Sequence, residues 1–259
     1  MATLTTYTHV EHLLHTFVSG VYDFLILEGN AGIGKSRVVS NFLEESDIYH
    51  VKIQGKITAI QFYETLYTFQ DAIIVLDDIP TSASMHDFWN LLLQVCQSEP
   101  VKTVNWKTRG KLAEGIPSQF ETTSRIVYLC NDWHAKNTYA PALESRGFHV
   151  KFIPTSEEIL QYARGFILEE VIQFFQQYLP FQPVINLRQL HYAQQLLEKG
   201  FPWQLPTVEQ WHLPVNTLSY VLIDIEFPTL SSKEKCQIWC QTNRKPQSVY
   251  QRLADQLER

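Results

Sequence analysis

One glycine-rich segment, Gly29 to Ser36, constrains this chain more than any other part of its sequence. It reads GNAGIGKS and matches the pattern G-x-x-x-x-G-K-[ST]. An apolar run at 23–28 before it is typical of a buried strand, and residues 35–45 after it have a helical pattern. Glycines there let backbone N–H groups turn toward a phosphate at the N-terminus of a helix. The segment therefore predicts a phosphate-binding loop between a strand and a helix.

The first half of the chain alternates strand-like apolar runs with amphipathic segments, which is typical of an α/β fold with a parallel sheet. Helices are expected at 35–45, 57–69 and 85–97. The expected strands are 23–28, 50–53, 72–76, 125–130 and 149–152. The pattern predicts five parallel strands sandwiched by helices.

The character of the sequence changes after Pro154. Residues 157–178 and 187–199 are helical by periodicity, and no strand-like run separates them. Pro202, Pro206 and Pro214 then indicate a linker-like stretch, and an apolar run at 220–225 leads to two final helices, 233–240 and 247–258. We expect an ATPase core over 1–155, a small helical lid over 156–200, and a C-terminal linker and helical region over 201–259.

Two adjacent carboxylates, Asp77 and Asp78, end the expected strand 72–76. Neighbouring carboxylates at a buried strand end repel each other unless a cation lies between them. Beside a phosphate-binding loop, this arrangement predicts that Ser36 and Asp77 hold Mg²⁺ and that Asp78 polarises the attacking water. The alternative is a solvated Asp-Asp turn before Pro80.

Composition and charge restrict the partners and the compartment. The chain has 259 residues and a net charge of −6, which is no general nucleic-acid footprint. From 231 to 259 there are six Lys or Arg and three Asp or Glu, so a basic tail follows an acidic body. No apolar run reaches the roughly 18 residues of a membrane span, and the N-terminal sequence does not resemble a signal peptide. The four cysteines form no disulfide pattern, which favours a cytoplasmic location.

From about residue 21 to 199 the sequence resembles the AAA+ family of P-loop ATPases. The strand RIVYLC is followed by Asn131 and Asp132, which resembles the family's sensor 1, where the Asn orients the lytic water. The segment ALESR ending at Arg146 resembles the stretch that carries the arginine finger, and Arg188 in NLR resembles sensor 2. Many relatives carry Glu where this chain has Asp78, which is one methylene shorter, so slow turnover is one expectation.

This resemblance implies ATP and Mg²⁺ as cofactors and a site shared between subunits of a ring or filament. The expected catalytic residues are Lys35, Asp78, Asn131 and Arg146. The expected nucleotide-binding residues are Gly29, Asn30, Ala31, Gly32, Ile33, Gly34, Lys35, Ser36, Arg37 and Arg188. Within the family the pattern looks most like the compact ATPases of phages, plasmids and transposons, because a strand-and-turn insertion precedes Asn131.

Two segments are candidates for nucleic-acid contact. The insertion gathers Lys102, Lys107, Arg109 and Lys111 around Trp106, either to line a pore or as a solvated hairpin whose Trp packs on the sheet. The tail 231–259 has the helix lengths and turn of a helix-turn-helix, and an αα-hairpin that completes the lid explains its apolar residues equally well.

The leading hypothesis is an AAA+ ATPase that hydrolyses ATP between subunits and acts on DNA or a DNA-bound complex. The alternatives are a slow nucleotide-dependent assembly switch and a protein-remodelling ATPase without a nucleic-acid partner. A metabolic P-loop kinase is disfavoured, because the helical segment after Pro154 is poor in arginine.

Overall fold

A computed structural model describes residues 1–80, 85–107, 111–134, 138–182 and 184–258. The chain forms two compact units, Met1–Pro154 and Thr155–Arg259. The first unit carries all the described strands, and the second is helical. Among the described residues, no helix is long and apolar enough to span a membrane.

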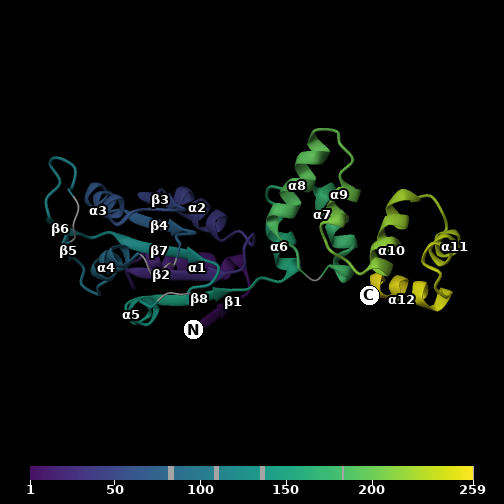
Figure 1. Ribbon diagram of the computed structural model, residues 1–259, viewed down its shortest axis with the longest axis horizontal. Coiled ribbons are helices and arrows are strands. Elements are labelled where there is room, and N and C mark those ends of the chain that lie inside the picture. The colour runs from purple at the N-terminus through teal and green to yellow at the C-terminus, as the bar shows by residue number, and fades with distance from the viewer. Residues whose placement is uncertain (81–84, 108–110, 135–137, 183, 259) are drawn as a thin grey trace. The chain divides into compact units, whose positions relative to one another are not determined.

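The first unit is built on a parallel sheet of six strands in the order β1-β8-β2-β7-β4-β3 (Figure 1). These strands are β1 (Ala2–Leu4), β2 (Phe24–Gly29), β3 (His50–Gln54), β4 (Ile73–Asp77), β7 (Arg125–Cys130) and β8 (Phe148–Phe152). The five predicted strands are all present, and β1 is a sixth that the sequence pattern did not indicate. It has only three residues, and its register Ala2↔Val150 is set by the neighbouring strand β8 rather than by a local apolar pattern.

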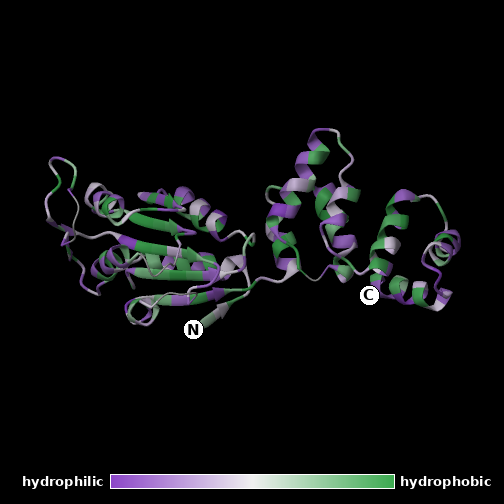
Figure 2. Cartoon of the chain, viewed as in Figure 1, coloured by the Kyte–Doolittle hydropathy of each residue, from purple (hydrophilic) through white to green (hydrophobic). Residues whose placement is uncertain are grey.

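Both faces of the central strands are buried. Every residue of β2 and of β4 is buried, so their sequences run apolar without alternation, as in sheets covered on both sides. The green colour of these strands in Figure 2 shows the same concentration of hydrophobic residues. One face, which includes Ile26, Ile74 and Ile126, packs in a single apolar cluster with α3, α4 and α5.

Helices alternate with the strands in this unit. The helices are α1 (Tyr7–Val18), α2 (Lys35–Glu45), α3 (Ala59–Thr68), α4 (His86–Val95) and α5 (Ala140–Glu144). Thr58 and Gln61 form a capping box that fixes the start of α3. Pairs such as Trp89 and Trp133, with ring centroids 6.1 Å apart, fill the layer between α4 and the sheet.

The predicted insertion is an antiparallel hairpin of β5 (Lys102–Asn105) and β6 (Gln119–Thr122). Trp106 follows β5, and its ring centroid lies 5.4 Å from that of Tyr63 on α3. Trp106 is therefore partly buried against the apolar core, which favours the packing alternative for this residue.

The second unit contains seven described α-helices and one short 3₁₀ turn. They are α6 (Ser156–Ala163), α7 (Glu169–Gln177), the 3₁₀ turn Leu179–Phe181, α8 (Leu187–Glu198), α9 (Gln204–Glu209), α10 (Val215–Glu226), α11 (Ser232–Asn243) and α12 (Gln247–Leu257). Two expectations were wrong here. The single helix predicted over 157–178 is divided between α6 and α7, and the expected linker contains α9. Pro206 is the third residue of α9, in the first turn, where an N–H has no helical partner to lose.

The last three helices pack around aromatic side chains. Tyr250 of α12 lies 5.1 Å from Tyr220 of α10 and 5.9 Å from Trp239 of α11, measured between ring centroids. The Trp239 indole N–H donates to the Asn216 carbonyl at 3.1 Å. Arg244, with φ of 51°, provides the left-handed turn that ends α11.

Candidate nucleotide site

The loop between β2 and α2 has the backbone geometry that its sequence predicts. Gly32 and Gly34 have φ of 79° and 86°, which L-residues with side chains rarely adopt. A Cβ on Gly29 would lie 2.5 Å from the Phe152 carbonyl oxygen, so only glycine fits between β2 and β8. Helix α2 begins immediately after Gly34 and directs its N-terminus toward the loop.

Lys35 is buried at the mouth of this loop. Its ammonium donates to the carbonyl oxygens of Gly29 at 2.7 Å and Asn30 at 2.9 Å. It also donates to Oδ1 of Asn131 at 3.0 Å. The side chain predicted to bind phosphate and the one predicted as sensor 1 are therefore in direct contact, although 96 positions separate them in the sequence.

Ser36 and Asp77, the two predicted metal ligands, also meet. The Ser36 hydroxyl donates to Oδ1 of Asp77 at 2.9 Å, and Asp77 is buried. The ammonium of Lys52, on β3, lies 2.8 Å from the other carboxylate oxygen as an ion pair. A hydroxyl and a carboxylate oxygen beside a phosphate-binding loop are the hard donors that Mg²⁺ prefers, so these residues fit that ion.

Asp78 differs from Asp77 in both exposure and backbone. It is exposed and has φ of 53°, and its N–H donates to the Leu129 carbonyl at 3.2 Å. The left-handed backbone turns the chain out of the sheet directly after the buried acid. Asp and Asn tolerate this conformation better than other residues with side chains, which is compatible with Asp at this position.

Strand β7, which directly precedes Asn131, ends at Cys130. Burial, together with the nearby Glu28 carboxylate, raises the pKa of the Cys130 thiol to about 12. The thiol is therefore protonated at neutral pH and is no nucleophile.

The loop has a further anchor that sequence reasoning missed. The hydroxyl of Tyr7, at the start of α1, donates to the Ile33 carbonyl at 2.7 Å, and both residues are buried. Tyr7 also packs edge to face against Phe152, with ring centroids 5.1 Å apart. A single tyrosine far upstream of the loop carries no local signal, so only the fold reveals this contact.

Arg146 lies away from the phosphate loop of the same chain. Its guanidinium donates to the Leu93 carbonyl on α4 at 3.1 Å. A Cβ on the next residue, Gly147, would lie 2.6 Å from the carbonyl oxygen of Phe24, the first residue of β2, whereas the phosphate loop follows the last. Arg146 is therefore near the amino-terminal end of β2, whereas Gly29 is at its carboxyl-terminal end.

The other two predicted nucleotide-binding arginines occupy different units. Arg37 is a half-buried residue of α2, two positions after Lys35. Arg188 is an exposed residue in the first turn of α8, in the second unit.

The basic residues of the insertion do not form one exposed cluster. Lys102 was predicted as a nucleic-acid contact, and this is wrong: its exposed fraction is 0%. Its ammonium donates to the Ser124 carbonyl and pairs with Asp23, each at 3.3 Å, because the β-alternation points it into the protein. Lys107 and Lys111 are exposed, and Arg109 lies outside the described residues.

Lys102→Ala is expected to lower the free energy of unfolding by about 3 kcal/mol, because it leaves Asp23 without its buried partner. Urea denaturation measures this loss. Lys111→Ala, an exposed change in the same insertion, is the control and is expected to alter stability by less than about 0.5 kcal/mol. Equal stability of the two variants would contradict a structural role for Lys102.

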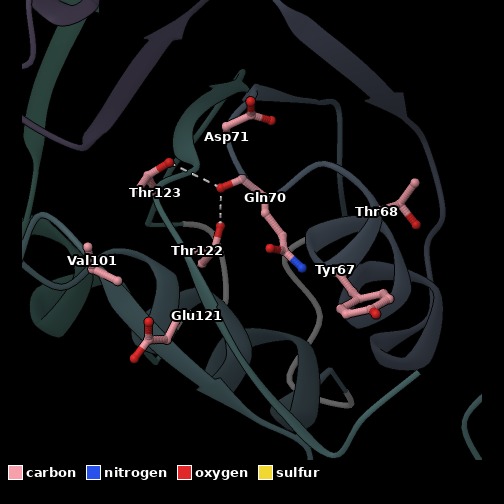
Figure 3. Close-up of a pocket in the computed structure, with 8 residues that line it drawn as sticks. All are labelled: Tyr67, Thr68, Gln70, Asp71, Val101, Glu121, Thr122 and Thr123. Carbon is pink, nitrogen blue, oxygen red and sulfur yellow. Dashed lines mark hydrogen bonds between the residues drawn. The ribbon is translucent and has the colours of Figure 1, made fainter. Parts of the chain in front are cut away.

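A wide surface pocket of the first unit lies away from this site. It has a volume of about 750 Å³ and is drawn in Figure 3. The carbonyl of Gln70 accepts from the hydroxyls of Thr122 at 2.7 Å and Thr123 at 3.3 Å in its wall. None of its lining residues belongs to the phosphate loop, so it is not part of the nucleotide site.

Comparisons with solved structures identify the fold. A point mutant of RuvB from Thermotoga maritima is 12% identical, with a TM-score of 0.52 over 95% of this chain and 85% of that chain. Cdc6p of Pyrobaculum aerophilum is 11% identical, with a TM-score of 0.51 over 97% of this chain and 83% of that chain. No protein-family model and no curated protein matches the sequence. The chain has the fold of the AAA+ P-loop ATPases, and the predicted fold class is confirmed.

Proposed function

We propose that this protein is an AAA+ ATPase that binds ATP with Mg²⁺ and hydrolyses it between the subunits of an oligomer. The observation that carries the proposal is that four residues predicted separately lie together at the carboxyl-terminal ends of the strands. Lys35 contacts Asn131, and Ser36 contacts Asp77, around a loop whose glycines have positive φ. Two pairs of this kind, which connect α2 to the ends of the two strands β4 and β7, favour a phosphate site over a chance glycine turn.

Each residue has a distinct role in this proposal. The amides of the loop from Gly29 to Gly34 surround the β-phosphate, and Lys35 leaves its carbonyl partners to bind the β- and γ-phosphates. Ser36 and Asp77 hold Mg²⁺, which neutralises charge on the phosphates. Asp78 accepts a proton from the attacking water, and the amide of Asn131 orients that water.

Arg146 completes the site of a neighbouring subunit. Its place at the opposite end of β2 from its own loop supports action in trans, since a subunit can present that end of the sheet to the loop of the next. An arginine there stabilises charge that develops on the γ-phosphate. Arg37 and Arg188 are assigned to nucleotide binding on the family resemblance alone.

The client in this proposal is DNA or a DNA-bound complex in the cytoplasm. The first turns of α12 expose Gln247, Ser248, Gln251 and Arg252, and Arg244 and Lys245 are exposed just before them. This basic, polar face lies opposite the buried Tyr250. It fits a helix whose side chains contact bases in a DNA groove while Arg244 and Lys245 contact phosphates. Lys107 and Lys111 are further candidates, and the four free thiols agree with a reducing compartment.

The double variant Lys245→Gln, Arg252→Gln is expected to weaken binding to duplex DNA and to reduce its salt dependence. Each lost phosphate contact lowers the slope of log K against log salt by about 1. Fluorescence anisotropy with a labelled duplex at several salt concentrations measures both quantities. Lys56→Gln, Lys199→Gln removes the same charge from exposed positions elsewhere and is the control. Identical slopes for the two double variants would favour the αα-hairpin alternative.

The slow assembly switch is the second candidate, and Asp78 favours it because its carboxylate reaches less far than a glutamate. Particle size in ATP and in ADP, set beside turnover, separates the two candidates. Assembly that depends on ATP while hydrolysis stays negligible supports the switch. A protein-remodelling role is favoured if DNA affinity is absent at low salt.

A further inference from the structure

A buried histidine beside the phosphate loop has a carboxylate on each side. Nδ1 of His149, on β8, lies 2.9 Å from Oε1 of Glu144, and Nε2 lies 2.9 Å from Oε2 of Glu28. The side chains of His149 and Glu28 are 7% and 6% exposed. A neutral imidazole carries one N–H, so it donates to one carboxylate and leaves a lone pair facing the other. Replacing the second proton by a metal ion satisfies both sides.

A second histidine converges on the same carboxylate. Nε2 of His134 lies 3.1 Å from Oε1 of Glu144. The ligand atoms of His134, Glu144 and His149 all lie within 4.8 Å of one another. Ligands bound at about 2.0–2.2 Å from a tetrahedral metal lie about 3.3 Å apart, so small side-chain movements suffice. His134 is 60% exposed and is free to make the largest of them.

We propose that His134, Glu144 and His149 form a site for a zinc-like transition-metal ion. Two imidazoles and one carboxylate are the donor set of three-ligand zinc sites, in which the fourth position takes water. Glu28 is not a ligand: it accepts the Nε2–H of His149 and so directs the Nδ1 lone pair toward the metal. The ring of Trp133, 6.2 Å from that of His149, packs against the buried imidazole.

This site is distinct from the magnesium site of the proposed ATPase. Nitrogen ligands favour zinc-like ions, whereas the hydroxyl and carboxylate of Ser36 and Asp77 favour magnesium. The metal would join the loop after Asn131 to the end of α5, two residues before Arg146. It would also connect both to Glu28, the residue that precedes the phosphate loop. Metal binding would therefore connect the segment that carries Asn131, which acts in its own subunit, with the segment that carries Arg146, which acts in the neighbouring subunit.

The test is titration of the metal-free full chain, purified without a histidine tag, with Zn²⁺ in isothermal calorimetry and with Co²⁺ in visible absorption. We expect one ion per chain and the intense visible bands of tetrahedral Co²⁺. His134→Ala is expected to weaken binding on the order of 100-fold, and Glu28→Gln to weaken it about 10–100-fold. His134 is exposed, so its variant tests the site without disturbing the core.

The matched control is His212→Asn, which changes an exposed histidine of the second unit and keeps a residue that tolerates its φ of 52°. It should bind one ion as tightly as the wild type. Absence of stoichiometric binding by the wild type at micromolar Zn²⁺, or unchanged affinity in His134→Ala, overturns the proposal and leaves a network of ion pairs. No nucleotide is present in these titrations, so their outcome is independent of the ATPase proposal.

Discussion

Replacing Lys35 with alanine is expected to weaken ATP binding about 10–100-fold. The ammonium contacts two loop carbonyls and Asn131, all of which surround the place where phosphate would enter. A charged hydrogen bond to phosphate contributes about 1.5–3 kcal/mol, so losing it weakens binding about 10–100-fold. Removal of the charge also removes long-range attraction for the nucleotide.

Thermal unfolding measures this effect. A ligand at 100 times its Kd stabilises the folded state by about 2.7 kcal/mol, so ATP with Mg²⁺ raises the unfolding temperature of the wild type. At the same ATP concentration, which is only about 1–10 times its own Kd, the Lys35→Ala protein should show a rise about half as large or smaller. Lys56→Ala, an exposed change in the same unit, is the control and should respond like the wild type. An equal shift in Lys35→Ala and wild type would contradict the assignment of the loop.

Asp78→Asn is expected to reduce ATP turnover about 100-fold or more while the protein stays as stable as the wild type. Loss of a general base typically costs 10²–10⁴-fold in rate, and an amide does not accept the proton, hence about 100-fold as the lower bound. Asn tolerates the φ of 53° at this position, so the backbone keeps its course.

Asp78→Gly separates the backbone from the charge. Glycine adopts positive φ without strain, so this variant should unfold at the same or a higher temperature while its turnover falls as far as that of Asp78→Asn. Phosphate release and thermal unfolding measured on the same preparations give both quantities. Asp71→Asn, an exposed acid that lies outside the loop region, is the control. Full turnover in both Asp78 variants would assign the base to another group.

Local patterns in the sequence were sufficient for the loop and the central sheet. The apolar strand, the glycines and Lys35 are contiguous, and each strand buried on both faces is a continuous apolar run. The positions of Asp77 and Asn131 were predictable because the carboxyl ends of parallel strands lie together. Residues at or just after those ends are therefore close to one another.

The sequence could not predict features that depend on long-range packing. Lys102 is polar in a hairpin rich in cations, and only the pairing of β5 with β6 points it inward toward Asp23. Strand β1 and the Tyr7 anchor depend on neighbours more than 20 positions away. The grouping of Glu28, Glu144 and His149 follows from the register of β2 with β8, and no motif in the sequence spans it.

Phosphate release from a mixture of two inactive variants shows whether the ATP site is shared between subunits. Lys35→Ala supplies Arg146 but no functional loop, and Arg146→Ala supplies the loop but no arginine. Each alone should hydrolyse ATP at background rate. In an equimolar mixture about one interface in four joins an intact loop to an intact arginine, so turnover should reappear at about that fraction of the wild-type rate. Wild-type turnover by Arg146→Ala alone, or a mixture no more active than its components, would contradict a shared ATP site.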